Sequence, residues 1–272
     1  MLCPHCRFRQ TTKLNRMTNL GYAVFRCGRC HRKFNERTGS CFNFLEFPTD
    51  IVFQVVLCRL RYKLSLRDLA ELFLLRGFSF THEAVREWEE RFAPLLAEQL
   101  RRKRKGKPSR KWYVDETYVK VKGKCCYLYR AIDQDGNLVD SLLSQKRDMA
   151  AAQRFYRSAV SMAVRRPERV TTDGLDSYPR AIREVLGSKV EHRDNWFLNR
   201  HIERDHRAVK QRYYPMLGFS AFASAQRFWR AFEEVRQYLR PRQKQNVFIS
   251  LAQRRMQFVT RVATLQSMFH VA

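Results

Sequence analysis

The order of strand-like and helix-like segments in the second half of the chain limits the possible folds more than any other feature. Three segments rich in β-branched and aromatic residues come first, at 112–121, 125–132 and 137–144. Lys122-Gly123 and Asp135-Gly136 separate them and are typical of tight hairpin turns. The pattern predicts a three-stranded antiparallel meander.

Shorter strands and longer helices alternate after this meander. Two strands are expected at 169–173 and 188–192, and three helices at about 149–164, 177–187 and about 199–214. Three strands followed by helix, strand, helix, strand and helix is the order of a ribonuclease-H-like α/β fold, a mixed sheet flanked by helices. We assign this catalytic core to residues 111–240 and a helical C-terminal tail to 241–272.

Three acidic residues lie at points of this pattern where they can meet. Asp115 is in the middle of the first strand, Asp173 ends the fourth strand, and Glu203 lies in the first turns of the last helix. If the first and fourth strands are neighbours, the three carboxylates can hold two Mg²⁺ ions, with Mn²⁺ as an alternative ion. Glu116 is expected on the strand face opposite Asp115.

The helix that carries Glu203 also carries a cationic row. Arg207 and Lys210 follow Glu203 by one and two helical turns, so all three share roughly one face and the two cations can contact DNA phosphates. The alternative is a solvated face in which Glu203 pairs with Arg207. Asp205 is expected to point away, and His206 to form a hydrogen bond or contact DNA rather than bind metal.

Four cysteines near the N-terminus form two Cys-x-x-Cys pairs, Cys3 with Cys6 and Cys27 with Cys30. Two tight turns with paired thiolates are the usual ligands of a structural, tetrahedral Zn²⁺. Residues 1–40 are therefore predicted to form a zinc ribbon, whose metal supplies most of its folding free energy. Direct DNA contact and protein contact are both open for this ribbon.

Residues 45–100 show helical periodicity. Ser65 and Asp68 make a capping-box pattern at the start of one helix, and Thr81 can cap the next. Helix, Gly-containing turn and helix is typical of a helix-turn-helix DNA-binding domain, with Thr81, His82 and Arg86 as candidate DNA contacts, although ordinary helical bundles show it too.

The chain carries 53 Lys and Arg against 26 Asp and Glu, a formal net charge of +27. This balance indicates a polyanionic partner, nucleic acid before an anionic membrane. Residues 101–110 concentrate the charge in a predicted basic linker, either solvated or bound to DNA phosphates. The candidate contacts there are Arg101, Arg102, Lys103, Arg104 and Lys105. No apolar run reaches the roughly 18 residues that span a bilayer, and the N-terminus lacks the apolar core of a signal peptide. We therefore expect a cytoplasmic, nucleoid-associated prokaryotic protein and no membrane partner.

Several blocks together resemble one known family. The segments VDETYVKVKGK, TTDGLDSYP and IERDHRAVK closely resemble DDE transposases of bacterial and archaeal insertion-sequence family six, and the resemblance runs from about residue 44 to about residue 240. Two positions depart from the family pattern: the connection between Asp173 and Glu203 is shorter than usual, and Arg200 stands where Asn is common.

The resemblance implies a metal-dependent polynucleotidyl transferase. Asp115, Asp173 and Glu203 take the positions of its catalytic triad, and Lys210 that of the basic residue after the Glu. It further implies binding of terminal inverted repeats and target DNA, replicative transposition of an insertion sequence, and a homo-oligomer. The alternatives are a catalytically silent or domesticated DNA-binding relative and a structure-specific nuclease on the same fold.

Overall fold

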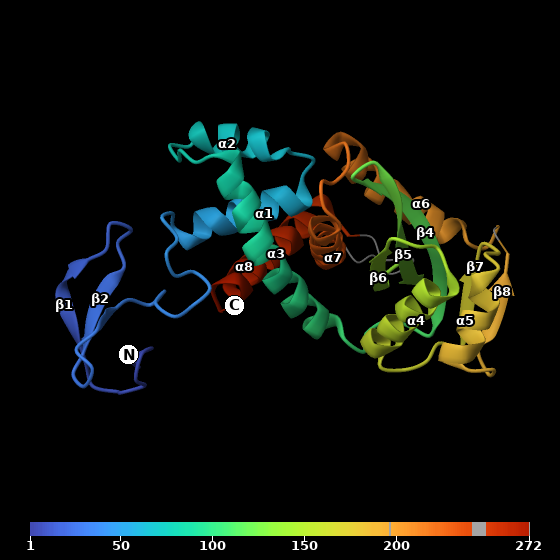
Figure 1. The fold of residues 1–272 in the computed structure, drawn as a ribbon, viewed down its shortest axis with the longest axis horizontal. Coiled ribbons are helices and arrows are strands. Elements are labelled where there is room, and N and C mark those ends of the chain that lie inside the picture. Colours follow the sequence, from blue (N-terminus) through green and yellow to red (C-terminus); the bar gives the residue numbers. More distant parts are fainter. Residues whose placement is uncertain (196, 241–248, 272) are drawn as a thin grey trace.

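The computed structural model describes residues 1–195, 197–240 and 249–271. A small N-terminal sheet, a helical bundle and an α/β unit lie in a row (Figure 1). None of the helices in these ranges combines the length and apolarity that a membrane span requires.

The α/β unit is built on a five-stranded mixed sheet of order β6-β5-β4-β7-β8. Its strands are β4 (Lys111–Val121), β5 (Lys124–Asp133), β6 (Leu138–Ser144), β7 (Arg169–Thr172) and β8 (Glu191–Asp194). The first three form the predicted antiparallel meander, whereas β7 runs parallel to both β4 and β8. The predicted ribonuclease-H-like mixed sheet is confirmed.

Helices cover both faces of this sheet. On β4, Trp112 and Val114 pack with α4 (Met149–Ala163) and α5 (Ser177–Leu186). Val119 and Val121 belong to the opposite core, with α6 (Arg200–Tyr213) and α7 (Phe222–Leu239). Even- and odd-numbered residues of β4 thus face different helices, as strand pleating requires.

The helical bundle contains α1 (Thr49–Arg61), α2 (Leu66–Leu74) and α3 (His82–Arg104). The predicted capping box at α2 is present, because Ser65 and Asp68 exchange hydrogen bonds of 2.8 and 3.1 Å. Thr81 caps α3 by accepting from the Ala84 N–H. Gly77 adopts a φ of +84° in the turn between the two helices, a conformation that favours glycine.

The predicted basic linker is wrong over its first residues, because α3 continues to Arg104. Arg101 and Arg104 are each only 8% exposed. They form ion pairs of 2.6 Å with Asp140 on β6 and Glu234 on α7, respectively. Both are wrong as predicted DNA contacts, since burial and neutralisation keep them from phosphate groups.

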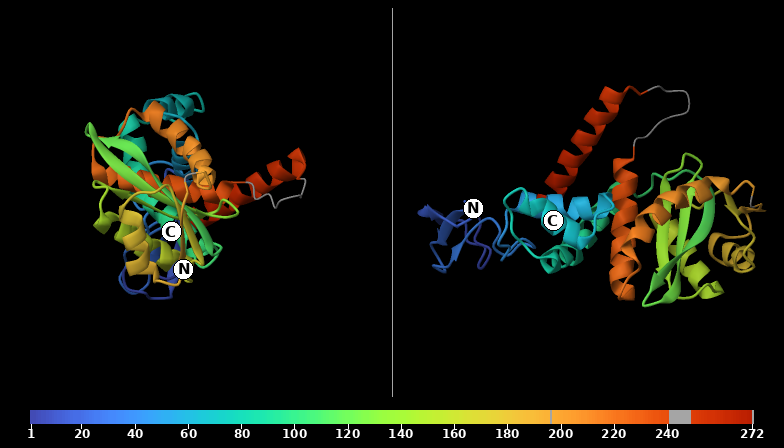
Figure 2. Two further views of the ribbon diagram at one scale, coloured as in Figure 1. Left: turned by 90° about the vertical axis from the view of Figure 1, so that its right-hand side faces the viewer. Right: turned by 90° about the horizontal axis from the view of Figure 1, so that it is seen from above.

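Among the described residues of the predicted C-terminal tail, only the end of α8 packs into the core of the bundle. Residues 241–248 and 272 lie outside the described residues, and α8 (Leu251–Val271) follows. The Phe269 ring is fully buried and lies 5.1–5.3 Å from the rings of Phe42, Phe53 and Phe92. Figure 2 shows this end of α8 against the bundle and its other end projecting away.

Candidate active site

Pairing of β4 with β7 brings the first two predicted acids together. Tyr113 pairs with Thr171 in this parallel register, so Asp115 and Asp173 are level with each other two residues further on. Gly174 turns the chain after β7 with a φ of +96°, and a Cβ there would lie 2.9 Å from Asp194 Oδ1. The turn that presents Asp173 therefore requires glycine.

Glu116 lies beside these two acids, a contact that the sequence pattern did not predict. Asp115, Glu116 and Asp173 each offer a carboxylate oxygen, and these oxygens lie within 4.8 Å of one another. Glu116 does extend toward the α4–α5 face, where Tyr178 donates a hydrogen bond to it and Arg147 forms an ion pair with it. The Glu116 side chain thus points in the expected direction. Because β4 continues past the end of its pairing with β7, the Glu116 carboxylate still lies close to those of Asp115 and Asp173.

Burial and like charge make this carboxylate cluster electrostatically unfavourable. The Asp115 residue is 9% exposed. Burial, together with the charges of Asp173, Glu116 and Glu203, raises the pKa of Asp115 from 3.8 to about 8. The Oδ1 atom of Asp173 is also buried, with no hydrogen-bond partner among the described residues. A bound cation would offset both penalties.

Helix α6 carries the third predicted acid above the cluster. Asn199, fully buried, donates a 3.0 Å hydrogen bond to the Val114 carbonyl and so fixes the start of α6 to β4. Glu203 is exposed and close enough for its charge to raise the pKa of Asp115, but its carboxylate lies outside the 4.8 Å cluster. Within the described part of the chain it has neither a hydrogen bond nor an ion pair, so the alternative pairing with Arg207 does not occur.

The inner face of α6 is held by a buried charged network. Asp205 points away from the cluster, as expected, and pairs with Arg130 at 2.5 Å and with Arg236. His206 is 4% exposed, and its Nδ1 lies 3.5 Å from Asp115 Oδ2. Burial, together with the Arg130 charge, lowers the pKa of His206 to about 2, so its ring is neutral. Its burial excludes the DNA contact considered for it.

The remaining predicted DNA contacts differ in their availability. Arg207, Lys210 and Lys105 are exposed. Arg102 pairs with Glu98 at 3.1 Å on the surface of α3, and the Lys103 ammonium lies over the Tyr238 ring. Near the start of α3, His82 and Arg86 both contact Glu83, at 3.1 and 2.7 Å.

Comparisons with known proteins define the family. Residues 109–242 match the sequence profile described as "DDE domain". The chain is 37% identical over 175 residues to a transposase for the insertion sequence-like element IS431mec of Staphylococcus aureus strain Mu50, which covers 63% of this chain and 77% of that protein. The chain belongs to the DDE transposases of insertion-sequence family six. A transposase for insertion sequence element IS257 in transposon Tn4003 from the same species shows equal identity and coverage.

Two solved structures have weaker likenesses to this transposase. The intasome of simian T-cell lymphotropic virus with a PP2A regulatory subunit gives a TM-score of 0.38 at 15% identity, over 54% of this chain and 53% of that chain. The HTLV-2 integrase catalytic core domain in complex with magnesium gives a TM-score of 0.34 at 13% identity, over 47% of this chain and 86% of that chain. The ribonuclease-H-like fold is instead defined by the order and directions of the five strands in the mixed sheet.

The carboxylate cluster fits the divalent cation that a DDE domain implies. Hard cations such as Mg²⁺ prefer oxygen ligands, and three carboxylates converge here around an unpaired buried oxygen. Among the described residues, the cluster has no nitrogen or sulfur ligand apart from the neutral ring of His206 beside it. The acids between β4 and β7 thus fit a hard divalent cation.

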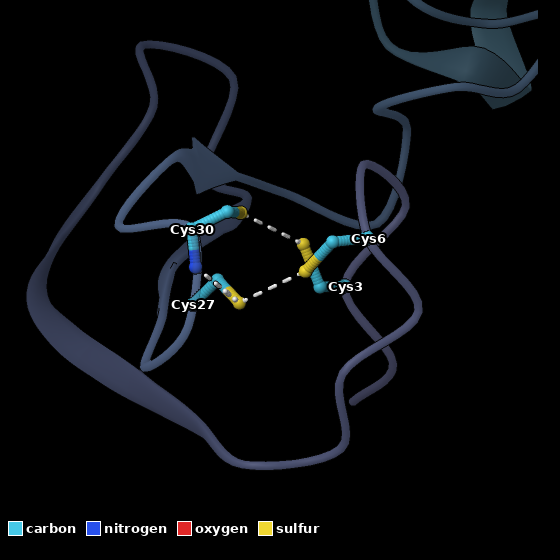
Figure 3. Close-up of side chains that lie close together, drawn as sticks. All are labelled: Cys3, Cys6, Cys27 and Cys30. Carbon is cyan, nitrogen blue, oxygen red and sulfur yellow. Dashed lines mark hydrogen bonds between the residues drawn. The ribbon is translucent and has the colours of Figure 1, made fainter.

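The N-terminal residues form a second, chemically different candidate metal site. Strands β1 (Thr11–Met17), β2 (Ala23–Cys27) and β3 (Lys33–Phe34) make a small antiparallel sheet, and the four predicted cysteines converge beside it (Figure 3). The Sγ atoms of Cys3 and Cys30 are 3.6 Å apart, and those of Cys6 and Cys27 are 3.5 Å apart. Four thiolates around Zn²⁺ lie about 3.8 Å from one another, so the cluster fits a structural zinc ion.

Backbone groups prepare this thiolate cluster for a metal. The N–H groups of Cys30 and Arg29 donate to the Sγ of Cys27. Hydrogen bonds from Cys30 first, and from Arg29, lower the pKa of Cys27 from 9.0 to about 6. At neutral pH this cysteine is therefore available as a thiolate, the form that binds zinc.

Proposed function

We propose that this transposase binds the terminal inverted repeats of an insertion sequence and catalyses Mg²⁺-dependent cleavage and strand transfer of the DNA, leading to replicative transposition. The observation that carries the proposal is the parallel pairing of β4 with β7, which sets Asp115 beside Asp173 below the start of α6. Of the three clustered acids, Glu116 is paired with Arg147, whereas Asp115 has only the neutral ring of His206 beside it. Such a shortage of positive partners is expected of a site that binds cations.

In this proposal Asp115, Asp173 and Glu203 hold two Mg²⁺ ions, or Mn²⁺ in their place. Bound metal would activate water or a DNA 3′-hydroxyl and stabilise the leaving oxygen. The Glu203 side chain is on an exposed face and has no hydrogen bond or ion pair among the described residues, so it can turn toward the cluster without breaking either. Its closure would complete the site.

The residues around the acids position them and the DNA. Asn199 holds α6 at a fixed distance from β4, and the neutral His206 ring lies against Asp115 without cancelling its charge. Arg207 and Lys210 extend from the exposed face of α6 and would bind the phosphates next to the scissile bond. The row of acid and cations along one helix orients a DNA strand relative to the cluster.

The other parts of the chain would serve DNA binding and assembly. We assign residues 1–40 to a ribbon with structural Zn²⁺ on Cys3, Cys6, Cys27 and Cys30. Residues 45–100, with Thr81, His82 and Arg86, would bind the inverted repeats. The active form would be a homo-oligomer that holds paired element ends and target DNA.

Strand transfer by the purified full chain tests this function. The assay uses Mg²⁺, then Mn²⁺, and DNA carrying the element's own ends, with Glu203→Gln as the test variant. Glu168→Gln is the matched control, because Glu168 is an exposed carboxylate at the opposite end of β7. Joined products from wild type and control, but not from Glu203→Gln, would support the proposal. End binding without joined products from any protein would favour a catalytically silent relative.

A further inference from the structure

A groove of about 480 Å³ lies where the bundle meets the far end of α6. The end of α1 and the starts of α2 and α3 form one wall, and the segment from the end of α6 through η1 (Tyr214–Met216) to α7 forms the other. Its charged lining is mostly basic, with Arg59, Lys63, Arg67, Arg86 and Arg212 against Glu89.

Arg212 is the unusual member of this lining. It is 3% exposed, and its guanidinium donates a hydrogen bond of 2.8 Å from Nη2 to the Arg59 carbonyl. Its Nε is buried without a hydrogen-bond partner, and no carboxylate of the described chain lies within 4.0 Å of its guanidinium. The Phe228 ring, whose centroid lies 5.1 Å from the Arg212 Cζ, offsets only part of the cost of burying a guanidinium without a carboxylate partner, and a bound anion would offset more.

The neighbouring charges do not supply that anion. Glu89 is already paired with Arg59 at 2.5 Å, and Arg59 adds a like charge beside Arg212. Burial, together with Arg59, lowers the pKa of Arg212 to about 10, so the guanidinium stays charged at neutral pH. Lys63 and Arg67 are exposed at the rim of the groove and have no ion pair among the described residues.

The position of the groove indicates which anion it binds. Helix α6 carries Glu203, Arg207 and Lys210 on its exposed face and Arg212 near its end. Nine residues of α-helix from Glu203 to Arg212 span roughly 14 Å. Arg212 itself faces inward, about half a turn out of phase with Glu203, but DNA that lies along the exposed face of α6 can extend to the rim of the groove. His82 and Arg86 at the start of α3 line the groove as well.

We propose that this groove binds a backbone phosphate of the DNA, with the exposed Lys63 and Arg67 as direct contacts at its rim and the buried positive charge of Arg212 at its base attracting the phosphate from below. Arginine suits this role because its planar guanidinium matches the oxygens of a phosphate. The contact would fix the DNA between the bundle and the carboxylate cluster independently of base sequence. The inference rests on the proposed function, because it takes DNA as the substrate.

The test measures affinity of the full chain for duplex DNA carrying the element's ends, over a series of salt concentrations. The variant Lys63→Gln/Arg67→Gln should bind roughly tenfold more weakly near 0.1 M salt, and the slope of log affinity against log salt should fall by about 0.9 per lost phosphate contact. The control Arg165→Gln/Arg166→Gln makes the same charge change on exposed residues that follow α4. It should leave the slope unchanged.

A second measurement locates the phosphate. Single neutral methylphosphonates are placed along the DNA, and each is tested against wild type and Arg212→Gln. One position should weaken wild-type binding severalfold but have no further effect on the variant. If Arg212→Gln does not fold, the same scan with Lys63→Gln/Arg67→Gln gives the answer.

The outcomes separate this inference from the proposed function. Equal losses in the groove and control variants would overturn the inference, since only net charge would then matter. Groove variants that keep full DNA affinity but lose self-association in light scattering would make the groove a protein contact and also overturn it. In both cases strand transfer by the wild type would still stand, whereas a wild type that binds no DNA would refute both.

Discussion

The two metal clusters of this transposase are assembled in opposite ways. The cysteine cluster comes from residues 3–30 and from two local turns, and its surrounding core has only Cys3, Cys27 and Phe34 fully buried. The carboxylate cluster joins residues far apart in the chain, and a large core of the sheet with α4 and α5 supports it. We therefore expect the first site to need its metal in order to fold, and the second to form without its metal.

This difference has an energetic consequence. Folding of the ribbon gains free energy only when Zn²⁺ joins its thiolates. Folding of the α/β unit instead forces like charges together, and its hydrophobic core offsets that cost. Loss of metal should therefore unfold one region and leave the other intact.

The largest expected effect is loss of the ribbon. Cys3→Ser/Cys6→Ser removes two of four zinc ligands, so residues 1–40 should unfold, bound zinc should fall to zero, and limited proteolysis should cut within this segment. The α/β unit should keep its melting transition. Cys125→Ser, at an exposed cysteine outside the cluster, is the control and should retain zinc. A zinc-free ribbon that still resists protease would break the comparison.

Next in size is the effect of Asp115→Asn on catalysis. Strand transfer should fall at least about a thousandfold, because the side chain is placed to bind the metal. The melting temperature should not fall and should rise by a few °C, because the variant removes a carboxyl whose ionised form is strongly disfavoured in this buried site. Asp135→Asn, in an exposed hairpin turn, should change neither quantity. A variant that is both inactive and clearly less stable would show that Asp115 supports the fold.

Buried charges that are matched should behave differently from the crowded acids. Arg104→Met removes the shorter of the two ion pairs of the buried Glu234 and leaves only the 3.3 Å pair with Arg101. It should lower the free energy of unfolding by about 3–5 kcal/mol. Arg102→Gln, two residues earlier on the exposed face of α3, should stay within about 0.5 kcal/mol of wild type. Chemical denaturation measures both. Equal stability of the two variants would contradict the assigned ion pairs.

Local patterns predicted most of the elements, because turns, caps and strand alternation depend on neighbouring residues. The capping box at Ser65, the Thr81 cap and the β4–β6 meander are examples. The positions of Asp115 and Asp173 in their strands also predicted that the two side chains meet, because neighbouring parallel strands bring residues at the same level together.

Contacts between distant segments were not predictable in this way. Arg101 and Arg104 look like solvated cations in sequence, and only the docking of α7 and β6 supplies their acidic partners. Glu116 joins the cluster because β4 extends beyond β7, and Asn199 acts through a backbone carbonyl that carries no sequence signal. Arg212 is buried only because the bundle packs against α6.

The smallest expected effect is a pH dependence of stability in buffer without added divalent cations. The folded-state pKa of Asp115 is raised from 3.8 to about 8, so its proton stabilises the fold at low pH, and this stabilisation is lost as the pH rises toward 8. The melting temperature of wild type should therefore fall behind that of Asp115→Asn by a few °C between about pH 5 and about pH 9. Added Mg²⁺ should close the gap. A constant gap across this range would show that Asp115 is not desolvated.

The insertion of Phe269 among Phe42, Phe53 and Phe92 constrains how the protein is made. During translation α1 to α3 leave the ribosome first, and the α/β unit follows as a separate folding unit. The bundle cannot close its core until the end of α8 has also emerged. A nascent or prematurely terminated chain thus carries a bundle whose aromatic core stays incomplete until synthesis has passed residue 269.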